Sequence, residues 1–278
     1  MKIKHAVAIR FYPFVFGVYN NDITDYDFLK KEFDLLRTNV IKSLEEQNNK
    51  NFEVIIIYNG SLDLSKYDFL NKDNLSDKLD ITFIGVNDIS LSEYHNYISK
   101  FYNDYEWIIE TRIDHDDFVF KYAVDDIQNK IKASEIDLMV YGYCNGYTYI
   151  NGEIYDFFTD CHGIGVWSVF ASLAYRTNIV KFLPTISIYN DHGKFKTTII
   201  DKIKNNDNDI NVSFIQNKDK KAFIWYRHDA CWSTKGEKKY FSIDTLTGYA
   251  KRKLLNPDLS NKDKNKIKED FGFNYTII

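Results

Sequence analysis

The sequence is poor in cysteine and proline, and both shortages limit the kind of protein that it encodes. Three cysteines occur among 278 residues, and no two of them have the C-x-x-C spacing. An odd number of widely separated cysteines is a poor basis for a disulfide framework, so we expect free thiols in a reducing compartment. Prolines also number three, and no linker rich in proline, glycine or serine divides the chain. We therefore expect a single domain.

Long apolar runs and a basic excess are also missing. The first apolar run is interrupted at Arg10 and no run approaches a transmembrane span, so we expect neither a signal peptide nor a membrane helix. The net charge of −4 does not suit a nucleic-acid binder. We expect a cytoplasmic protein. The lysine-rich segments 251–253 and 262–268 would allow peripheral contact with the inner face of an anionic membrane, although a solvated helix face explains them more simply.

What the chain does contain is enough apolar surface for a large core, arranged as alternating strands and helices. Hydrophobic residues make up 44% of it and aromatic residues 17%. Continuous apolar runs predict buried strands, and helical periodicity predicts helices between them. The predicted strands cover 5–11, 53–58, 81–84, 106–113 and 137–143, and the predicted helices cover 26–47, 91–102 and 118–132. This alternation is typical of an α/β fold with a mixed, mostly parallel sheet flanked by helices.

The rest of the chain has a different pattern. Residues 147–158 predict a hairpin around Asn151-Gly152, a dipeptide that favours a type I′ turn. Further strands are expected at 168–176 and 222–227. The lysine-rich segment from Lys238 onward is expected to be mostly helical.

An acidic cluster follows the predicted strand 106–113. Asp114, Asp116 and Asp117 lie within four positions, directly after that apolar segment. Two unit charges about 5 Å apart repel by roughly 3 kcal/mol at an effective dielectric near 20, so the cluster needs solvent or a cation. One aspartate is explained as the N-cap of the next helix, but a cap does not explain all three.

A bound divalent cation explains the cluster better. An EF-hand that began at Asp114 would need Gly and Glu where this chain has Val119 and Asp125, so a calcium loop is excluded. Carboxylate oxygens suit Mg²⁺ or Mn²⁺ held partly by substrate phosphates. In open α/β sheets, ligands bind beyond the carboxyl ends of the strands, which is where these aspartates fall.

Four sequence elements, in order, resemble GT-A-type glycosyltransferases and, more narrowly, a family of bacterial rhamnosyltransferases. The segment Thr111–Asp117 resembles their R-[LI]-D-x-D-D signature, a DXD motif, and Ile9-Arg10-Phe11 resembles the R-F that ends their first strand. Ser43 to Gln47 with Phe52 resembles S-L-x-x-Q-x-x-x-x-F, and Trp225 to Ser233 resembles W-x-x-H-x-x-x-x-S. The match covers about two thirds of the chain and implies a GT-A-like, Rossmann-like fold.

The resemblance also implies roles for individual residues. Asp114 and Asp116 would hold Mn²⁺ or Mg²⁺, Asp117 would be a further ligand or the helix cap, and His228 would return late in the chain as another ligand. Arg112 would contact the nucleotide or its phosphates, with an ion pair to a nearby aspartate as the equally good alternative. The remaining nucleotide-binding candidates are Arg10, Phe11, Asn59 and Asp114.

A catalytic base is needed if the reaction inverts the configuration of the sugar, because the acceptor hydroxyl must lose its proton. The candidates are Asp160, Asp191 and Asp229, each of which is also a common turn or cap residue. Asp191 is slightly favoured because Asp-His opens a predicted helix. A retaining reaction would need no such base.

These expectations define a function and a division of the chain. We expect a hexosyltransferase that moves a sugar, with rhamnose suggested by the family, from a dTDP-, UDP- or GDP-linked donor to a glycan or lipid-linked acceptor in surface-polysaccharide synthesis. The alternatives are a metal-dependent phosphoesterase and a non-enzymatic carbohydrate-binding protein. The single domain 1–278 would contain a nucleotide-binding half (1–143), an acceptor-side half (144–235) and a helical tail (236–278).

Overall fold

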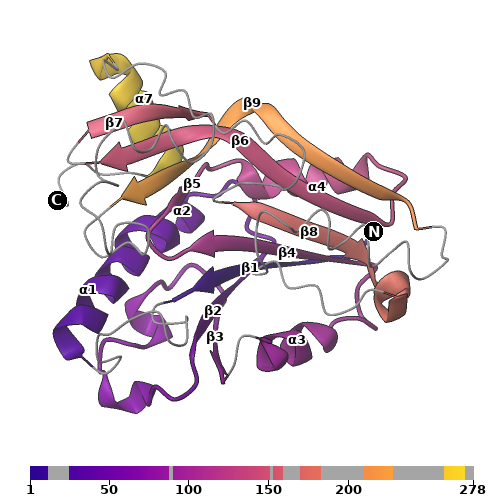
Figure 1. Ribbon diagram of the computed structural model, residues 1–278, viewed down its shortest axis with the longest axis horizontal. Coiled ribbons are helices and arrows are strands. Elements are labelled where there is room, and N and C mark those ends of the chain that lie inside the picture. The colour runs from indigo at the N-terminus through magenta and orange to yellow at the C-terminus, as the bar shows by residue number, and fades with distance from the viewer. Residues whose placement is uncertain are drawn as a thin grey trace.

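The computed structural model describes residues 1–11, 25–87, 90–150, 153–158, 170–182, 210–227 and 260–272. The strands in these ranges join one mixed sheet with the order β3-β2-β1-β4-β8-β6-β9-β5, and β7 pairs with β6 (Figure 1). Their bounds are β1 Ile3–Arg10, β2 Glu53–Asn59, β3 Ile81–Val86, β4 Trp107–Asp114, β5 Phe118–Val119, β6 Leu138–Ile150, β7 Glu153–Phe158, β8 Ala171–Arg176 and β9 Val212–Arg227.

Strand direction divides this sheet into two parts. β1 is parallel to both β2 and β4, and β2 is parallel to β3. β8 then runs antiparallel between β4 and β6, while β6 and β9 are parallel to each other. The predicted mixed α/β sheet with flanking helices is confirmed, and strands from both the first and the second half of the chain contribute to it.

Helices cover both faces of the parallel part, and one further helix, α7, packs elsewhere on the sheet. Their bounds are α1 Tyr26–Leu36, the π-helical η1 Arg37–Ile41, α2 Lys42–Glu45, the short 3₁₀ turns η2 Leu64–Lys66, η3 Lys72–Asn74 and η4 Thr177–Phe182, and α3 Ser92–Ser99, α4 Ala123–Lys132 and α7 Asn261–Phe271. Strand side chains alternate between two hydrophobic clusters. Val7 and Ile9 pack with α1, η1, α2 and α4, whereas Ala6 and Ala8 pack with α3.

The first helix shows how the apolar pattern produces local structure. The Asp25 carboxylate accepts a hydrogen bond from the Phe28 N–H at 2.7 Å, which caps α1. Leu29, Phe33 and Leu36 are buried, so the predicted amphipathic stripe is confirmed. The predicted helix 26–47 forms as α1, η1 and α2 in succession, with a π-helical segment in the middle.

Two predicted elements begin at different residues in the structure, and a third is confirmed. The helix expected from Phe118 begins at Ala123, because Phe118 and Val119 form β5 and pair with Ile224 and Phe223 of β9. β9 begins at Val212 rather than 222, since its polar middle still pairs with β6. The hairpin of β6 and β7 is confirmed by the pairing of Ile150 with Glu153, and its turn residues lie outside the described ranges.

The C-terminal helix packs on the far part of the sheet. Ser260 caps α7, and Gly272 ends it in the left-handed conformation with φ of 67°. Ile267 and Phe271 of this helix are buried in a third cluster with Phe118 and Tyr149. No described helix has both the length and the apolar character needed to span a membrane.

Candidate active site

The acidic cluster lies at the carboxyl-terminal edge of the parallel strands. Asp114 is the last residue of β4, and in the parallel register it is the partner of Arg10, the last residue of β1. Arg112 precedes Asp114 by two positions and therefore points to the same face of the sheet. Adjacent parallel strands thus bring one carboxylate and two guanidinium groups to the edge where open α/β sheets bind ligands.

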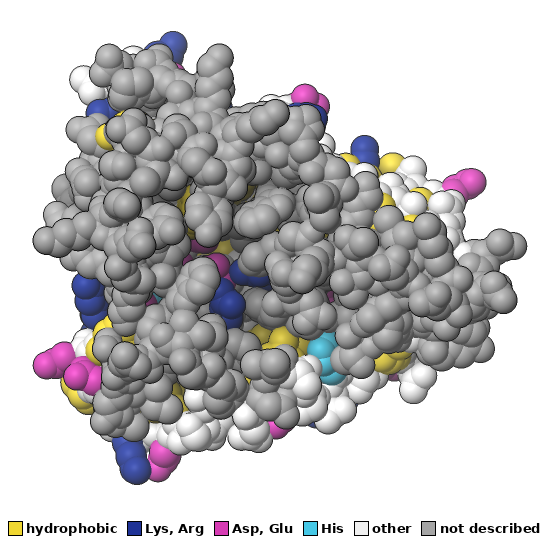
Figure 2. Space-filling model, viewed as in Figure 1, with side chains coloured by type: hydrophobic (Ala, Val, Ile, Leu, Met, Phe, Trp, Pro, Cys, Tyr) yellow, Lys and Arg dark blue, Asp and Glu magenta, His cyan; other side chains and the backbone are white. Residues whose placement is uncertain are grey.

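Asp114 forms ion pairs with both arginines. Its Oδ1 is 3.1 Å from Nη2 of Arg10 and 3.2 Å from Nη2 of Arg112. The side chain of Asp114 is 33% exposed, whereas that of Arg112 is 3% exposed. The alternative role predicted for Arg112, an ion pair with a nearby aspartate, is therefore confirmed. Figure 2 shows basic and acidic side chains next to one another near the centre of the face in view.

Asp116 and Asp117 are more enclosed than Asp114. Asp117 is 2% exposed, and its Oδ1 accepts a hydrogen bond from the Tyr226 N–H at 3.0 Å. This bond ties the acidic loop to the end of β9. The predicted helix-cap role of Asp117 is wrong, because α4 has Tyr122 at its N-cap position. Asp116 is also buried, and its backbone carbonyl accepts a hydrogen bond from Asn39.

His115, between these aspartates, turns toward α1. Its Nε2 lies 2.6 Å from Oε2 of the buried Glu32, and its ring makes an edge contact with Phe11. Burial by itself would lower the pKa of His115. The hydrogen bond with Glu32 and the charges of Asp116 and Asp114 outweigh burial and raise this pKa to about 9. His115 therefore holds the loop against the helix as a cation.

Phe11 and Asn59, which the sequence suggested for nucleotide binding, have structural partners. Phe11 is buried and packs edge-to-face against Phe33 as well as against His115. Asn59 ends β2, and its Oδ1 accepts hydrogen bonds from the N–H and hydroxyl of Ser61 at 3.0 and 2.8 Å. Both residues shape the edge of the sheet through these contacts. Nucleotide contact by either one stays a prediction.

The acidic loop is also held from behind by a set of neutral side chains, which we call the buried bracket: Asn39, Ser43 and Gln47. Asn39 Nδ2 donates to the Asp116 carbonyl at 2.7 Å, and Ser43 Oγ accepts from the Val119 N–H at 3.2 Å. Gln47 Nε2 donates to the Phe120 carbonyl at 2.8 Å, and its Oε1 accepts from the Val124 N–H at 3.2 Å. The bracket thus fixes the backbone on both sides of β5.

The bracket is what the sequence reasoning missed. The S-L-E-E-Q element contains Ser43 and Gln47. Its sequence does not indicate that these two side chains bind backbone groups more than seventy positions later in the chain. Asn39 lies in the π-helical segment η1, a type of distortion that is common at functional sites. The available signal is the spacing of four positions between Asn39, Ser43 and Gln47, which places three polar side chains on one helix face without identifying their partners.

The carboxylates fit a divalent cation only as part of a larger ligand set. Among the described residues, no group of three or more His, Cys, Asp or Glu side chains is arranged to hold a metal ion. Oδ1 of Asp117 accepts from the Tyr226 N–H, and the Asp114 carboxylate is paired with Arg10 and Arg112, so Asp114 would have to exchange part of these contacts to bind Mg²⁺ or Mn²⁺ together with Asp116. His228, the predicted additional ligand, and the base candidates Asp160, Asp191 and Asp229 lie outside the described ranges.

Comparison with protein-family models and with curated proteins gives no match. Among solved structures, the chain is similar to TarS 1–349 of S. aureus, with 14% identity, a TM-score of 0.41, and 81% of this chain and 60% of that chain covered. This chain thus spans less than two thirds of that structure. It is also similar to TarS 1–349 in complex with UDP-GlcNAc, with 16% identity, a TM-score of 0.44, and coverage of 100% and 74%.

A third similar structure is that of a protein assigned as a nucleotide-diphospho-sugar transferase from Desulfovibrio desulfuricans G20. The identity is 13%, the TM-score is 0.45, and 88% of this chain and 94% of that chain are covered. All three TM-scores lie below 0.5. The function of this chain is therefore argued from its own residues.

Proposed function

We propose that this chain is a metal-dependent glycosyltransferase of the hexosyltransferase type, which uses a nucleotide-diphosphate sugar as its donor. The observation that carries the proposal is the ion-paired group of Asp114, Arg10 and Arg112 at the carboxyl edge of the parallel strands. It agrees with the R-I-D-H-D-D resemblance. Guanidinium groups bind phosphate oxygens through paired hydrogen bonds, so Arg10 and Arg112 would hold the diphosphate of the donor.

Asp114 would position both arginines before the donor arrives. Each guanidinium nitrogen that contacts Asp114 is within 3.2 Å of it, which limits the rotation of two long side chains. A group that is held in place before binding loses less conformational entropy when the ligand binds. The buried bracket and His115 would add to this effect, because they fix the loop that carries Asp114 and Asp116.

Asp114 and Asp116 would hold Mg²⁺ or Mn²⁺, with His228 as a further ligand. When bound, the ion supplies positive charge that stabilises the diphosphate as it leaves the sugar. The chain's own residues would orient the donor and exclude water. In an inverting reaction Asp191, or else Asp160 or Asp229, would take the proton of the acceptor hydroxyl.

The finer parts of the proposal follow the family resemblance. The donor would be dTDP-rhamnose, or else a UDP- or GDP-linked sugar. The acceptor would be a glycan or a lipid-linked sugar in surface-polysaccharide synthesis, at the inner face of the membrane. The lysine-rich segments 251–253 and 262–268 would provide the peripheral contact there.

Thermal-shift screening tests the donor site. UDP, GDP and dTDP are each added with and without Mn²⁺ to the wild type, to Asp114→Asn and to Asp104→Asn. Asp104 is an exposed aspartate before β4, at the opposite end of that strand, so its variant makes the same charge change outside the site. We expect one diphosphate with Mn²⁺ to stabilise the wild type and Asp104→Asn but not Asp114→Asn. A ligand present at about 100 times its Kd adds roughly 2.7 kcal/mol.

The same screen separates the alternatives. Stabilisation by Mn²⁺ together with inorganic phosphate, but by no nucleotide, would favour a phosphoesterase. The absence of any response to the three diphosphates, with or without the ion, would contradict the transferase proposal.

A further inference from the structure

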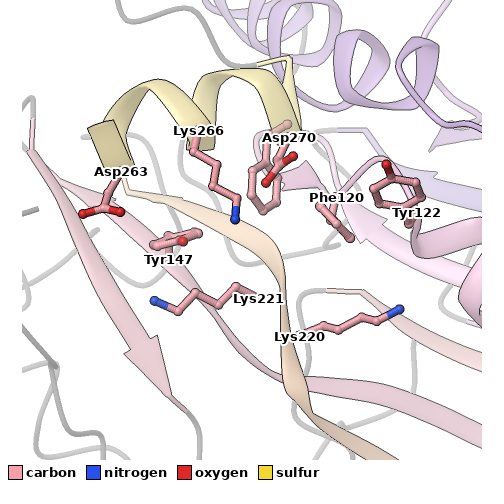
Figure 3. A pocket seen from close by; sticks show the side chains of 9 residues that line it. Phe120, Tyr122, Tyr147, Lys220, Lys221, Asp263, Lys266 and Asp270 are labelled. Atoms are coloured by element: carbon pink, nitrogen blue, oxygen red, sulfur yellow. The ribbon is translucent and has the colours of Figure 1, made fainter. Parts of the chain in front are cut away.

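A second candidate binding site lies on the other side of β5 from the acidic loop. A cavity of about 660 Å³ opens between α7, the middle of β9, the outer part of β6 and the segment after β5 (Figure 3). Cavities of roughly 300–1,000 Å³ accommodate small-molecule ligands. The lining combines four aromatic rings with lysine and aspartate side chains.

The aromatic rings form a connected apolar wall. Tyr147 and Phe271 make an edge contact with ring centroids 6.0 Å apart, and Phe271 lies 5.8 Å from Phe120. Tyr122 continues the series at 5.0 Å from Phe120, and it is 39% exposed. The wall therefore extends from the buried cluster under α7 to the surface. Phe271 is buried, so the rings that can pack against the apolar C–H faces of a sugar are the exposed Tyr122 and the half-buried Phe120 and Tyr147.

The charged groups around the cavity cancel one another. Lys220 is 2.5 Å from Asp126, and Lys221 is paired with Asp156. On the opposite side Asp270 lies 3.1 Å from Lys121. Because each of these charges has an opposite partner, the cavity offers little net attraction for a polyanion or for an anionic membrane.

Donors and acceptors nevertheless remain close to the rings. Lys266 extends from α7 into the cavity, on the same side as Asp270 (Figure 3). The ammonium group of Lys221 lies over the Tyr147 ring, 4.7 Å from its centroid. An aromatic wall beside both donors and acceptors, with balanced charge, matches a ligand that has many hydroxyl groups and apolar C–H faces.

We propose that this cavity binds an uncharged oligosaccharide. The lining does not include the acidic loop: Phe120, its lining residue nearest to the loop in sequence, follows Asp117 by three residues, and Lys221 precedes Tyr226 by five residues of β9, or roughly 16 Å of strand. The inference goes beyond the proposed function, because the cavity would bind such a glycan even if the chain transferred no sugar.

Calorimetric titration with defined tetrasaccharides tests this site. The neutral probes are maltotetraose, cellotetraose, chitotetraose and mannotetraose, and the anionic probe is tetragalacturonate. We expect at least one neutral probe to bind, and its affinity to fall roughly three- to tenfold in Tyr122→Ala, as loss of an aromatic contact implies. Tyr26→Ala is the matched control, because Tyr26 is a similarly exposed tyrosine outside the cavity.

A second pair of variants tests the site at exposed lysines, whose substitution is not expected to impair folding. Lys266→Ala removes a lining donor, whereas Lys262→Ala removes an exposed lysine of the same helix that does not line the cavity. We expect weaker binding only in Lys266→Ala, and unchanged binding in Asp114→Asn. The proposal is overturned if no neutral probe binds, if tetragalacturonate binds in their place, or if Tyr122→Ala and Tyr26→Ala bind equally.

Discussion

The two sides of the acidic loop are held by different kinds of interaction. On the outer side, Asp114 forms ion pairs with Arg10 and Arg112, and its carboxylate is 33% exposed. On the inner side, the buried bracket holds the same loop with neutral hydrogen bonds. Exposed ion pairs are screened by water and contribute little to stability, whereas a buried polar group that loses its partner costs about 1–3 kcal/mol.

Because of this difference, the outer side is suited to ligand binding and the inner side to stabilising the fold. The outer side can exchange its partners for a ligand because the side chains of Arg10 and Asp114 are about one third exposed, although Arg112 behind them is buried. The inner side cannot exchange its partners without exposing backbone groups to an apolar interior. We therefore expect substitutions on the outer side to reduce ligand affinity at nearly constant stability, and substitutions in the bracket to reduce stability first.

Gln47→Leu is expected to have the largest effect on stability. It removes the side-chain partner of the Val124 N–H and one of the two donors to the Phe120 carbonyl, which still accepts from the Ala123 N–H, while it keeps the apolar volume of the side chain. One buried N–H without a partner and one lost hydrogen bond to a carbonyl predict a loss of roughly 2–3 kcal/mol in the free energy of unfolding, measured by urea denaturation. Gln47→Glu should lose at least as much at neutral pH, because it buries a carboxylate that faces the Phe120 and Ser43 carbonyl oxygens. Equal stability of Gln47→Leu and the wild type would contradict the role of the bracket.

Glu110→Gln is expected to change how the free energy of unfolding depends on pH. Glu110 lies on β4 and is buried, and burial raises its pKa to about 7 against the opposing hydrogen bonds from Tyr94 and Tyr175. Between pH 4.5 and 7 the unfolded chain loses this proton before the folded chain does, so the wild type loses stability as the pH rises. The glutamine variant lacks this loss, and Tyr175 can still donate to its amide oxygen.

The difference in unfolding free energy between the two proteins is expected to increase as the pH rises. The unfolding free energy of Glu110→Gln should match that of the wild type near pH 4.5 and exceed it by up to about 3 kcal/mol at pH 8. Urea denaturation at a series of pH values measures this difference. Parallel pH profiles for the two proteins would show that Glu110 ionises normally in the folded state.

Asn39→Ala should have a smaller effect on stability and a visible effect on binding. It removes the donor to the Asp116 carbonyl, which predicts a loss of about 1–2 kcal/mol. Because Asp116 is a proposed metal ligand, a less constrained loop should also weaken the metal-dependent response to the nucleotide. Thermal shift with and without Mn²⁺ measures both effects. A full ligand response in the destabilised variant would mean that the bracket stabilises the fold without positioning the site.

Lys30→Ala is expected to have the smallest effect. Lys30 and Asp34 form an exposed pair one helical turn apart in α1, with 2.7 Å between Nζ and Oδ1. Such pairs contribute about 0.3–0.5 kcal/mol, so the shift in unfolding free energy should be within that range. A loss above about 1 kcal/mol would contradict the contrast drawn between exposed ion pairs and the bracket.

Local pattern predicted the parallel half of the fold well, because each of its strands and helices carries its own periodicity. β2 is a continuous apolar run, and α1 has a buried stripe of Leu29, Phe33 and Leu36. The same logic failed at Phe118 and Val119. These residues are strand rather than helix because they pair with β9, more than a hundred positions later in the chain. Such a contact has no local signature.

The sequence likewise predicted one part of the candidate site, the charged edge, but not the other, the buried bracket. Arg10 and Asp114 were both expected at the nucleotide site, Asp114 because ligands bind beyond the carboxyl ends of the strands and Arg10 through the family resemblance, and their ion pair brings them together. The bracket could not be assigned, because the side chains of Asn39 and Gln47 bind backbone groups and a backbone group has no sequence identity. The π-helical turn that presents Asn39 was equally hidden, since the apolar stripe continues across it.

The central claim is that the charged edge around Asp114 binds a nucleotide diphosphate together with a metal ion. Isothermal titration calorimetry tests it with the diphosphate selected by thermal shift, in the presence and absence of Mn²⁺. Our account predicts binding to the wild type that requires Mn²⁺ and is weakened at least about a hundredfold in Asp114→Asn, a loss of roughly 2.7 kcal/mol. Equal affinity of the two proteins for the diphosphate in the presence of Mn²⁺ would contradict the account.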